Sequence, residues 1–464
     1  MLPECRAGEY LFPVPKFELA ASDVASFMED LGTFHGEFHD CFTRSETREN
    51  VLLYMNGLFS KLERKSIEPI AVHLESGRVR AMQRSISETP WDDDAILNKY
   101  RSMVNEDFGD PSGVLIFDEC GFAKKGDDSV GVARQYCGNL GKVDNCQVGV
   151  YAAYASRHGY AVIDKRLFIP EGWFGDEYKE RREKCELPDE LAFKTKPQLA
   201  VEMLEGVRAA KVPFRYVAAD TVYGESPDFI AGIEKDPAAT YFVAIASNTQ
   251  LWVNAPATQK RKYRYGGKLK ERVVLRGDAK KPITAQEFAS NLHDFFWYRR
   301  TVSEGTKGPI EYEFTKRRVT IARDGLPDKE VWLVIKRNVG PERVYRFSIS
   351  NAPLSTKLST FVWLSGMRWP VEQCFEEMKT ELGMDHYEVR KYRGWNHHMQ
   401  VTMLAHFFLW HLKLRLGKKS TSAYFIAGED DSGTYASHAD VRRGRRTRAR
   451  SVDSGEESSG DAVT

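Results

Sequence analysis

Residues 113–118 read "GVLIFD", a short apolar run that ends in an acid. Before it, residues 17–104 carry apolar side chains three and four positions apart, a spacing typical of amphipathic helices. After it, apolar β-rich runs follow one another. The change at residue 113 therefore predicts that a helical N-terminal part gives way to a sheet-forming domain.

The segments that follow predict a mixed sheet. In chain order they are strands at 146–156 and 159–170, an amphipathic helix at 196–211, a strand at 214–220, a short helix near 227–234 and a strand at 240–247. Hairpin strands followed by a crossover helix favour a mixed five-stranded sheet with helices packed on it, which is an α/β fold.

The pattern then changes twice more. Residues 248–350 hold several strand-like stretches and little helical period, so we interpret them as a β-rich insertion. From about residue 417 the chain is rich in Ser, Gly, Arg and Asp without periodicity, which predicts a disordered tail. The predicted division is a helical N-terminal domain (1–110) that either binds DNA or only packs, the first part of the core (111–247), the insertion (248–350), the second part of the core with a helix (351–416), and the tail (417–464).

Composition limits the class of protein. The 464 residues are 42% hydrophobic, enough for a large core, and the formal net charge of +1 means that any basic surface must be local. Seven cysteines without a C-x-x-C pair argue against a disulfide framework or a zinc ribbon and favour a reducing cytosol. Because no signal peptide and no apolar run of roughly 20 residues is present, we expect a cytoplasmic protein without membrane association.

Two acids stand at the ends of predicted strands. Asp118 closes "GVLIFD" and Asp220 closes "FRYVAAD". In an open sheet, ligands collect beyond the carboxyl ends of the strands. A lone acid there is more often a turn former or a helix cap. Two together can share a hard cation such as Mg²⁺, which prefers oxygen ligands.

A third acid comes from "MRWPVEQCFEEMKTELG", residues 367–383. Arg368, Glu372 and Lys379 are four and seven residues apart, which stacks them along one side of a helix. Such a stripe is usually a solvated face. If the helix packs beside the first strand, however, Glu372 can join the two aspartates while Arg368 and Lys379 hold phosphates. The alternative is that these two bases only form ion pairs with Glu372 or Glu376.

In this pattern the chain resembles the DDE transposases of bacterial insertion sequences, whose catalytic core is RNase H-like. It is most similar to the branch with a β-rich insertion before the last Glu and a Y-x2-R-x3-E-x6-K motif. Arg368, Glu372 and Lys379 match the last three motif positions, whereas Ser365 stands at the tyrosine position and Cys120 where Thr or Ser is usual.

Three further stretches carry the resemblance, which runs from roughly residue 40 to residue 413. They are "FDECGFAKKGDDSVGVARQYCGNLGKVDNCQVGV", "AADTVYG" and "LGMDHYEVRKYRGWNHHMQVTMLAHFFL". The first two are similar to the segments that hold the two catalytic aspartates, and the third is similar to the family's ending.

The resemblance implies a Mg²⁺-dependent transposase that cuts and pastes DNA. Asp118, Asp220 and Glu372 would hold two Mg²⁺ ions about 4 Å apart, with Mn²⁺ able to substitute. Water would free a 3′-hydroxyl at the transposon end, and that hydroxyl would attack target DNA. The implied partners are transposon-end and target DNA and a second copy of the chain, at the nucleoid. Two alternatives stay open: a transposase-derived DNA-binding protein that no longer cuts, and another RNase H-like nuclease, which the long insertion disfavours.

Several basic and aromatic residues are candidates for DNA contact. The glycine-containing loop after Asp118 either follows a DNA backbone or forms a polar hairpin; its bases are Lys124, Lys125 and Arg134. In the insertion, "QKRKYRYGGKLKER" (259–272) mixes bases with tyrosines, which suits backbone neutralisation with stacking; it includes Lys260, Arg261 and Lys262. Trp297 is a candidate for stacking on a flipped or distorted base, although such a tryptophan is more often a core residue.

Overall fold

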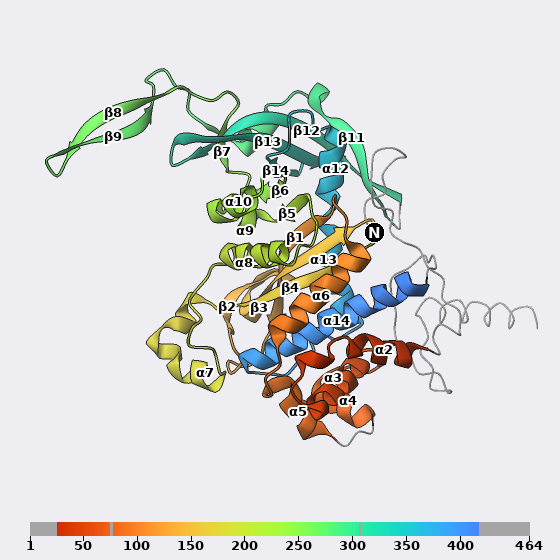
Figure 1. Ribbon diagram of the computed structural model, residues 1–464. Helices are drawn as coiled ribbons and strands as arrows, with labels where there is room; N and C mark the ends of the chain where they lie inside the picture. The colour runs from red at the N-terminus through yellow and green to blue at the C-terminus, as the bar shows by residue number, and fades with distance from the viewer. Residues whose placement is uncertain (1–25, 75–77, 306–307, 417–464) are drawn as a thin grey trace, which may run out of the picture.

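The computed structural model describes residues 26–74, 78–305 and 308–416, and Figure 1 shows their arrangement. The predicted tail at 417–464 lies outside the described residues. The N-terminal part is helical, as its spacing predicted. Its helices are α2 (Phe27–Gly36), α3 (Ser45–Leu58), α4 (Ile67–His73), α5 (Val79–Ser87) and α6 (Asp93–Phe108), with the short 3-10 turn His39–Cys41 between α2 and α3.

A mixed sheet follows, and it contains the five strands that the sequence predicted. They are β1 (Val114–Ala123), β3 (Lys142–Ser156), β4 (Gly159–Phe168), β5 (Tyr216–Ala219) and β6 (Thr240–Ile245). Their order is β4–β3–β1–β5–β6. The β1–β5 and β5–β6 pairs are parallel, whereas β3 is antiparallel to both β1 and β4. The short strand β2 (Ala133–Cys137), which the sequence did not predict, pairs with the start of β3.

Strand β1 is longer than predicted. We expected it to end at Asp118, but it continues to Ala123 because its second half still pairs with β3. The parallel pairing of β1 with β5 nevertheless stops at Phe117 and Ala219. Asp118 and Asp220 are therefore each the first residue after the last parallel pair, although Asp118 lies in the middle of its strand.

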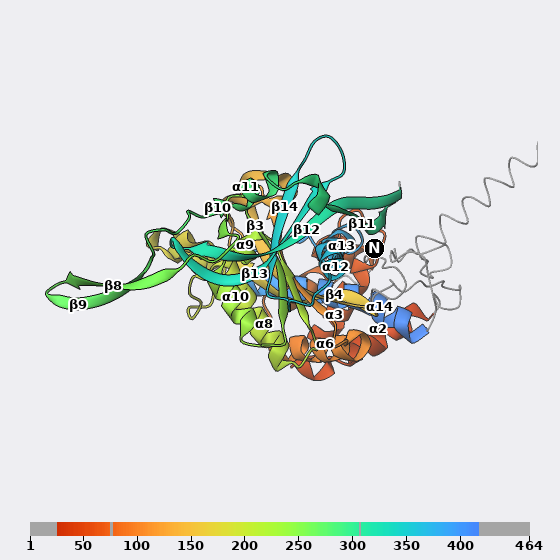
Figure 2. The same ribbon diagram turned by 90° about the horizontal axis from the view of Figure 1, so that it is seen from above.

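Helices cover both faces of these strands (Figures 1 and 2). The helices after β4 are α7 (Lys179–Lys184), α8 (Lys196–Ala209), α9 (Thr221–Gly224) and α10 (Pro227–Glu234), and those after the insertion are α12 (Leu358–Gly366), α13 (Trp369–Thr380) and α14 (Tyr392–Leu416). On one face, Phe117 of β1 packs on Phe229 of α10 with ring centroids 5.3 Å apart. On the other, Tyr151, the β3 partner of Asp118, packs on Phe375 of α13 at 5.1 Å. Because cross-strand partners share a face, Asp118 faces α13.

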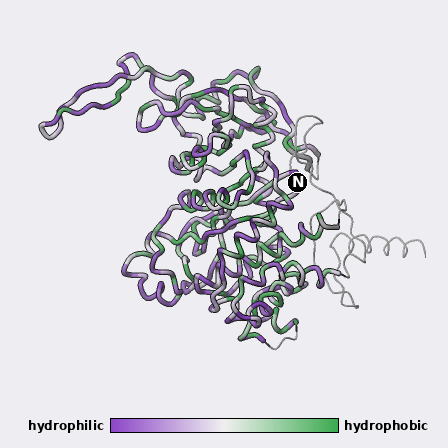
Figure 3. The backbone as a smooth tube through the Cα atoms, in the orientation of Figure 1, coloured by the Kyte–Doolittle hydropathy of each residue, from purple (hydrophilic) through white to green (hydrophobic). Residues whose placement is uncertain are grey.

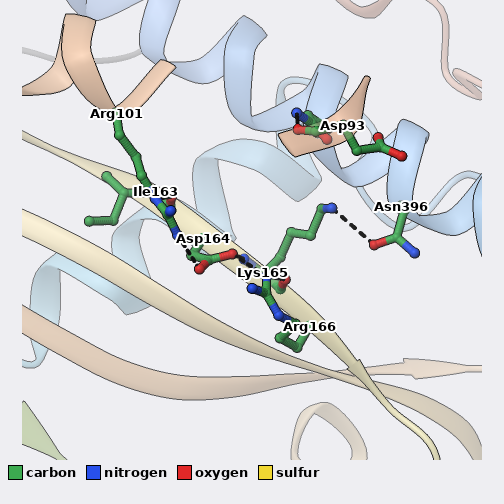
Figure 4. A network of polar contacts seen from close by, with 8 residues as sticks. Asp93, Arg101, Ile163, Asp164, Lys165, Arg166 and Asn396 are labelled. Carbon is green, nitrogen blue, oxygen red and sulfur yellow. Dashed lines mark hydrogen bonds and ion pairs between the residues drawn. The ribbon is translucent and has the colours of Figure 1, made fainter. Parts of the chain in front are cut away.

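Buried charges join the N-terminal helices to the sheet, as Figure 4 shows. Arg101 of α6 bonds to the fully buried Asp164 of β4, and Arg166 bonds to the other oxygen of the same carboxylate at 2.5 Å. The neighbouring Lys165 donates to Oδ1 of Asn396 on α14 at 2.9 Å, and its burial lowers its pKa to about 8. Breaking such a buried pair is costly because it leaves an uncompensated charge, so these contacts fix α6 and α14 on β4.

The β-rich segment at 248–350 extends the same sheet. Its strands and helix are β7 (Gln250–Trp252), β8 (Thr258–Tyr265), β9 (Lys268–Leu275), β10 (Ile283–Thr284), α11 (Ala285–Ser290), β11 (Tyr298–Gly305), β12 (Gly308–Arg323), β13 (Leu326–Asn338) and β14 (Tyr345–Ser350). Strand β14 pairs antiparallel with β6, so the ladder runs from the core through β14, β13 and β12 to β7. Only β8 and β9 form a separate two-stranded ribbon, which projects from the body in both views (Figures 1 and 2).

Among the described residues, no helix combines the length and the apolar character that crossing a membrane would require.

Candidate active site

The site begins with the two strand-end aspartates. Asp118 is 8% exposed, and its Oδ1 accepts a hydrogen bond from the backbone N–H of Glu119 at 2.9 Å. Asp220 caps the short helix α9, where its Oδ1 accepts from the backbone N–H of Val222 at 2.9 Å. Asp220 therefore acts as a helix cap through one of its oxygens, which is the structural role that a strand-end acid most often has. The other oxygen remains for further interactions.

Helix α13 brings Arg368 and Glu372 to the same place. Nη2 of Arg368 lies 3.0 Å from Oδ2 of Asp118 and 3.9 Å from Oε1 of Glu372. The helix is held by the buried Glu377, whose carboxylate bonds to His406 at 2.6 Å and to Tyr160 at 2.8 Å. The sequence thus correctly placed Glu372 on a helix that packs beside the first strand, with Arg368 between it and Asp118.

Electrostatic repulsion shows that the acids lie close to one another. Burial and then the nearby Asp118 raise the pKa of Asp220 to about 6, although Arg368 opposes the change. Burial raises the pKa of Glu372 as well, and Asp118 adds to that rise. The Glu372 side chain is 61% exposed, so solvent screens this second effect and Asp220 carries the larger share of the repulsion.

The positive charge of Arg368 reduces the repulsion between the acids. Burial alone would lower the pKa of its guanidinium, but Asp118, Asp220 and Glu372 together raise it above the ordinary value. Arg368 therefore stays protonated and partly balances the negative charge of the three acids.

Glu372 and Arg368 line a cleft of about 480 Å³ between the core and the β12–β14 strands. Its walls include Thr221 after β5, Lys336 of β13, Arg346 of β14, and Arg368 and Glu372 of α13. The sequence did not single out Lys336 or Arg346. The alternation of apolar and polar residues in "KEVWLVIKRN" indicates a strand, but it does not show which face of the strand lies toward the acids. That depends on the pairing with the neighbouring strands.

The structure places Lys379 apart from Arg368 on α13, and its contact with a DNA phosphate stays a prediction. It lies eleven residues further along α13, which at 1.5 Å per residue is roughly 16 Å. There its Nζ is 5.7 Å from the ring of Phe122, near the other end of β1. Lys124 lies close by, with its Nζ 3.6 Å from the Tyr387 ring, and burial lowers its pKa to about 8. Lys379 also interacts with the Cys120 thiol, which lies two residues along β1 from Asp118.

The other predicted contacts are spread over the surface. Lys125 and Arg134 are exposed, the former in the loop after β1 and the latter on β2. Trp297 is 7% exposed beneath Arg337, whose guanidinium lies 4.1 Å from the ring centroid, so its stacking on a base stays a prediction that burial makes difficult. Phe295, two residues before Trp297, is 77% exposed and was not singled out from the sequence.

The β8–β9 ribbon separates the basic run into two faces. Cross-strand partners and alternate residues share a face. What we term the tyrosine face comprises Arg261, Tyr263, Tyr265, Lys268, Lys270 and Arg272, and the leucine face comprises Lys260, Lys262, Arg264, Leu269, Glu271 and Val273. Arg261 therefore points away from its predicted neighbours Lys260 and Lys262, and DNA contact by each of them stays a prediction.

Acids that face a basic residue where parallel strands end, with cations on the opposite wall, define a site suited to phosphate esters. A sequence model of the family described as DDE superfamily endonuclease matches residues 37–309. Because this match covers more than half of the chain, the protein belongs to the DDE superfamily endonucleases. The match includes Asp118 and Asp220 and ends before Glu372.

The chain is also similar to the protein named probable transposase for insertion sequence element IS701 from Microchaete diplosiphon. The two are 25% identical over 340 residues, which cover 72% of this chain and 75% of that protein.

Proposed function

We propose that this DDE endonuclease is the transposase of an insertion element, which cleaves DNA at the element's ends and joins them to target DNA by cut and paste. One observation carries the proposal: Asp118 and Asp220 follow the last parallel pair of β1 and β5, and Asp118 contacts Arg368, which lines a cleft together with Glu372. Similarity to a probable IS701 transposase supports the same reading. A homodimer that brings two ends together is part of the proposal.

We further propose that β4–β3–β1–β5–β6 is an RNase H-like core. The order, with β3 antiparallel and β5 and β6 parallel to β1, supports this assignment. The segment 248–350 is then the insertion of the resembling branch, and 351–416 returns the chain to the core with α13. On this division, residues 26–110 are a helical part whose role includes packing on β4 and α14.

The donor set fits a hard divalent cation such as Mg²⁺. Carboxylate oxygens are the ligands that this ion prefers, and the mutual repulsion of Asp118 and Asp220 is what a bound cation would relieve. Within the described ranges, however, no three acidic, histidine or cysteine side chains lie close enough together to hold a metal. Arg368 lies against Asp118 instead, and Glu372 keeps an exposed side chain. Asp118, Asp220 and Glu372 are the residues that would hold the ion.

In this proposal the chain's own residues prepare the site for a DNA phosphate. A bound divalent cation would supply Lewis-acid activation of the attacking oxygen and charge stabilisation at the scissile phosphodiester. Arg368 exchanges its bond to Asp118 for a charge-assisted bond to a DNA phosphate. That exchange leaves the Asp118 carboxylate free to serve as a ligand. The buried Glu377–His406 contact keeps α13 in place while Arg368 changes partners.

The test is cleavage of DNA that carries the sequences flanking the gene, with Mg²⁺ and with EDTA. We expect Mg²⁺-dependent nicking at the element's ends, and we expect Glu372→Gln to abolish it. Glu376→Gln is the matched control, because Glu376 is an exposed acid one turn further along α13. Nicking that survives in Glu372→Gln, or that disappears equally in Glu376→Gln, would remove Glu372 from the catalytic role.

A second candidate function is a DNA-binding protein derived from a transposase. The observation that favours it is Ser365, which stands at the motif's tyrosine position and donates to the backbone oxygen of Val362 at 2.7 Å. Its hydroxyl is thus engaged within α12. Specific binding of the ends by the wild-type protein without any Mg²⁺-dependent nicking would support this candidate and contradict the first.

A further inference from the structure

Two cations that the sequence did not single out lie side by side on the cleft wall. Lys336 of β13 and Arg346 of β14 are direct cross-strand partners. Like charges placed directly opposite each other in a sheet destabilise the pair. Both side chains line the cleft that also holds Arg368 and Glu372. A nearby anion would reduce the repulsion between these two positive side chains.

Acidic residues of the chain balance the charge of this pair only in part. Within the residues that the structure describes, neither Lys336 nor Arg346 forms an ion pair with a carboxylate. The nearest partner of the Lys336 ammonium is the ring of Tyr312, whose centroid lies 4.8 Å from Nζ. Glu372 lines the same cleft as both cations, but its carboxylate already has Arg368 as an ion-pair partner at 3.9 Å. Three bases thus surround one exposed acid on this side of the cleft.

We propose that Lys336 and Arg346 form a binding subsite for a DNA backbone phosphate next to the phosphodiester that is cut. This inference rests on the proposed function and adds residues of β13 and β14 to it. A guanidinium can bond two phosphate oxygens at once and an ammonium acts as a point charge, so the pair suits one phosphate group. The subsite also assigns a function to strands β12–β14, because their residues form one wall of the cleft that Arg368 and Glu372 line.

The experiment measures binding of a fluorescein-labelled DNA duplex in EDTA, where no cleavage occurs, over a series of KCl concentrations. The variants are Lys336→Gln and Arg346→Gln. Lys329→Gln is the matched control, since Lys329 lies on the same strand, is exposed, and pairs with Glu234 outside the cleft. Each lost phosphate contact should make the dependence of log K on log salt shallower by about 0.9. We expect roughly 10-fold weaker binding at low salt for the two cleft variants.

Binding by Lys336→Gln and Arg346→Gln that equals binding by Lys329→Gln would overturn the subsite and leave both cations as neutralisers of Glu372. Recovery of affinity in Lys336→Arg would support a charge contact. If Lys336→Gln loses its native circular dichroism, the exposed Arg346 still decides the question through Arg346→Gln. A wild-type protein that fails to nick DNA in Mg²⁺ would contradict the proposed function, whereas the comparison in EDTA would still decide the subsite.

Discussion

At the scale of single residues, Arg368 connects the charges of the site. Its guanidinium contacts Asp118 at 3.0 Å, and it opposes the burial-driven rise in the pKa of both Asp220 and Glu372. Asp118 is buried, so without Arg368 its charge would lack a partner. The same residue therefore stabilises the free protein and is positioned to meet a phosphate.

Replacing Arg368 by Gln should consequently lower the free energy of unfolding. We expect a loss of about 1–3 kcal/mol in EDTA, because a buried carboxylate loses a charge-assisted bond while part of the Arg368 side chain is exposed. Urea denaturation at neutral pH measures the change. Divalent cations should recover part of the loss in Arg368→Gln by occupying the place of the guanidinium. No change in stability would mean that the contact with Asp118 is incidental.

The raised pKa of Asp220 predicts how the free energy of unfolding changes with pH. Its pKa is raised to about 6 by burial and by Asp118, so the folded state holds its proton more tightly than the unfolded chain does. The resulting stability is fully present below about pH 4, the unfolded value, and is lost as pH rises through about 6. A pKa difference of this size is worth at most about 3 kcal/mol, and partial exposure reduces our expectation to roughly 1–2 kcal/mol.

Asp220→Asn isolates this effect, because Asn caps helices about as well as Asp. In EDTA the variant should be more stable than wild type at pH 8 and should match it at pH 4. Unfolding curves at the two pH values test the expectation. A variant that is less stable at both pH values would show that the cap bond of the carboxylate outweighs the effect of its raised pKa.

At the scale of elements, local sequence patterns predicted where the strands lie better than they predicted which strands pair with each other. The apolar runs located β3, β4, β5 and β6, but nothing local in 248–350 says that β14 pairs with β6 and continues the sheet. Such pairing depends on residues about a hundred positions apart, as with Phe347 and Ile245. The acids were predictable because strand ends and helix spacing are local features. Lys336 and Arg346 were not, because their approach to the acids follows from sheet register.

The β8–β9 ribbon is the element whose function the register makes testable. A two-stranded ribbon without a core is marginally stable alone, and Figure 3 shows it as mostly hydrophilic. On the tyrosine face every charged residue is basic, and Arg272 lies 5.4 Å from the Tyr263 ring. The leucine face mixes bases with Glu271 and the exposed Leu269 and Val273. The first face is the one suited to a DNA backbone.

Two triple variants with equal loss of charge separate the faces. Arg261→Gln/Lys270→Gln/Arg272→Gln should weaken duplex binding and make its salt dependence shallower by about 2–3. Lys260→Gln/Lys262→Gln/Arg264→Gln should have a much smaller effect. Fluorescence anisotropy in EDTA measures both. Equal weakening by the two variants would mean that the ribbon acts through its total charge, and no weakening by either would exclude it from DNA binding.

At the scale of the whole molecule, the candidate metal ligands come from parts of the chain that fold around one another. Asp118 belongs to β1, Asp220 follows β5, and Glu372 lies on α13 after the strands of the insertion. A ligand that binds the folded state alone stabilises it by RT ln(1 + [L]/Kd), which is about 2.7 kcal/mol at 100 times Kd. The three acids are far apart in the sequence and come together only in the folded state. A bound divalent cation should therefore stabilise the entire fold.

We therefore expect Mg²⁺ or Mn²⁺ to raise the melting temperature of the wild-type protein in a concentration-dependent way. The rise should be larger at pH 7.5 than at pH 5.5, since the proton that Asp220 holds below about pH 6 competes with the cation. Glu372→Gln should reduce the rise, and Asp220→Asn should both reduce it and remove its pH dependence. Glu376→Gln should retain the wild-type response. Differential scanning fluorimetry with EDTA as the reference measures all four proteins. An identical rise in Glu372→Gln and wild type would place the cation at Asp118 and Asp220 alone, and an identical rise in all variants would place it elsewhere on the molecule.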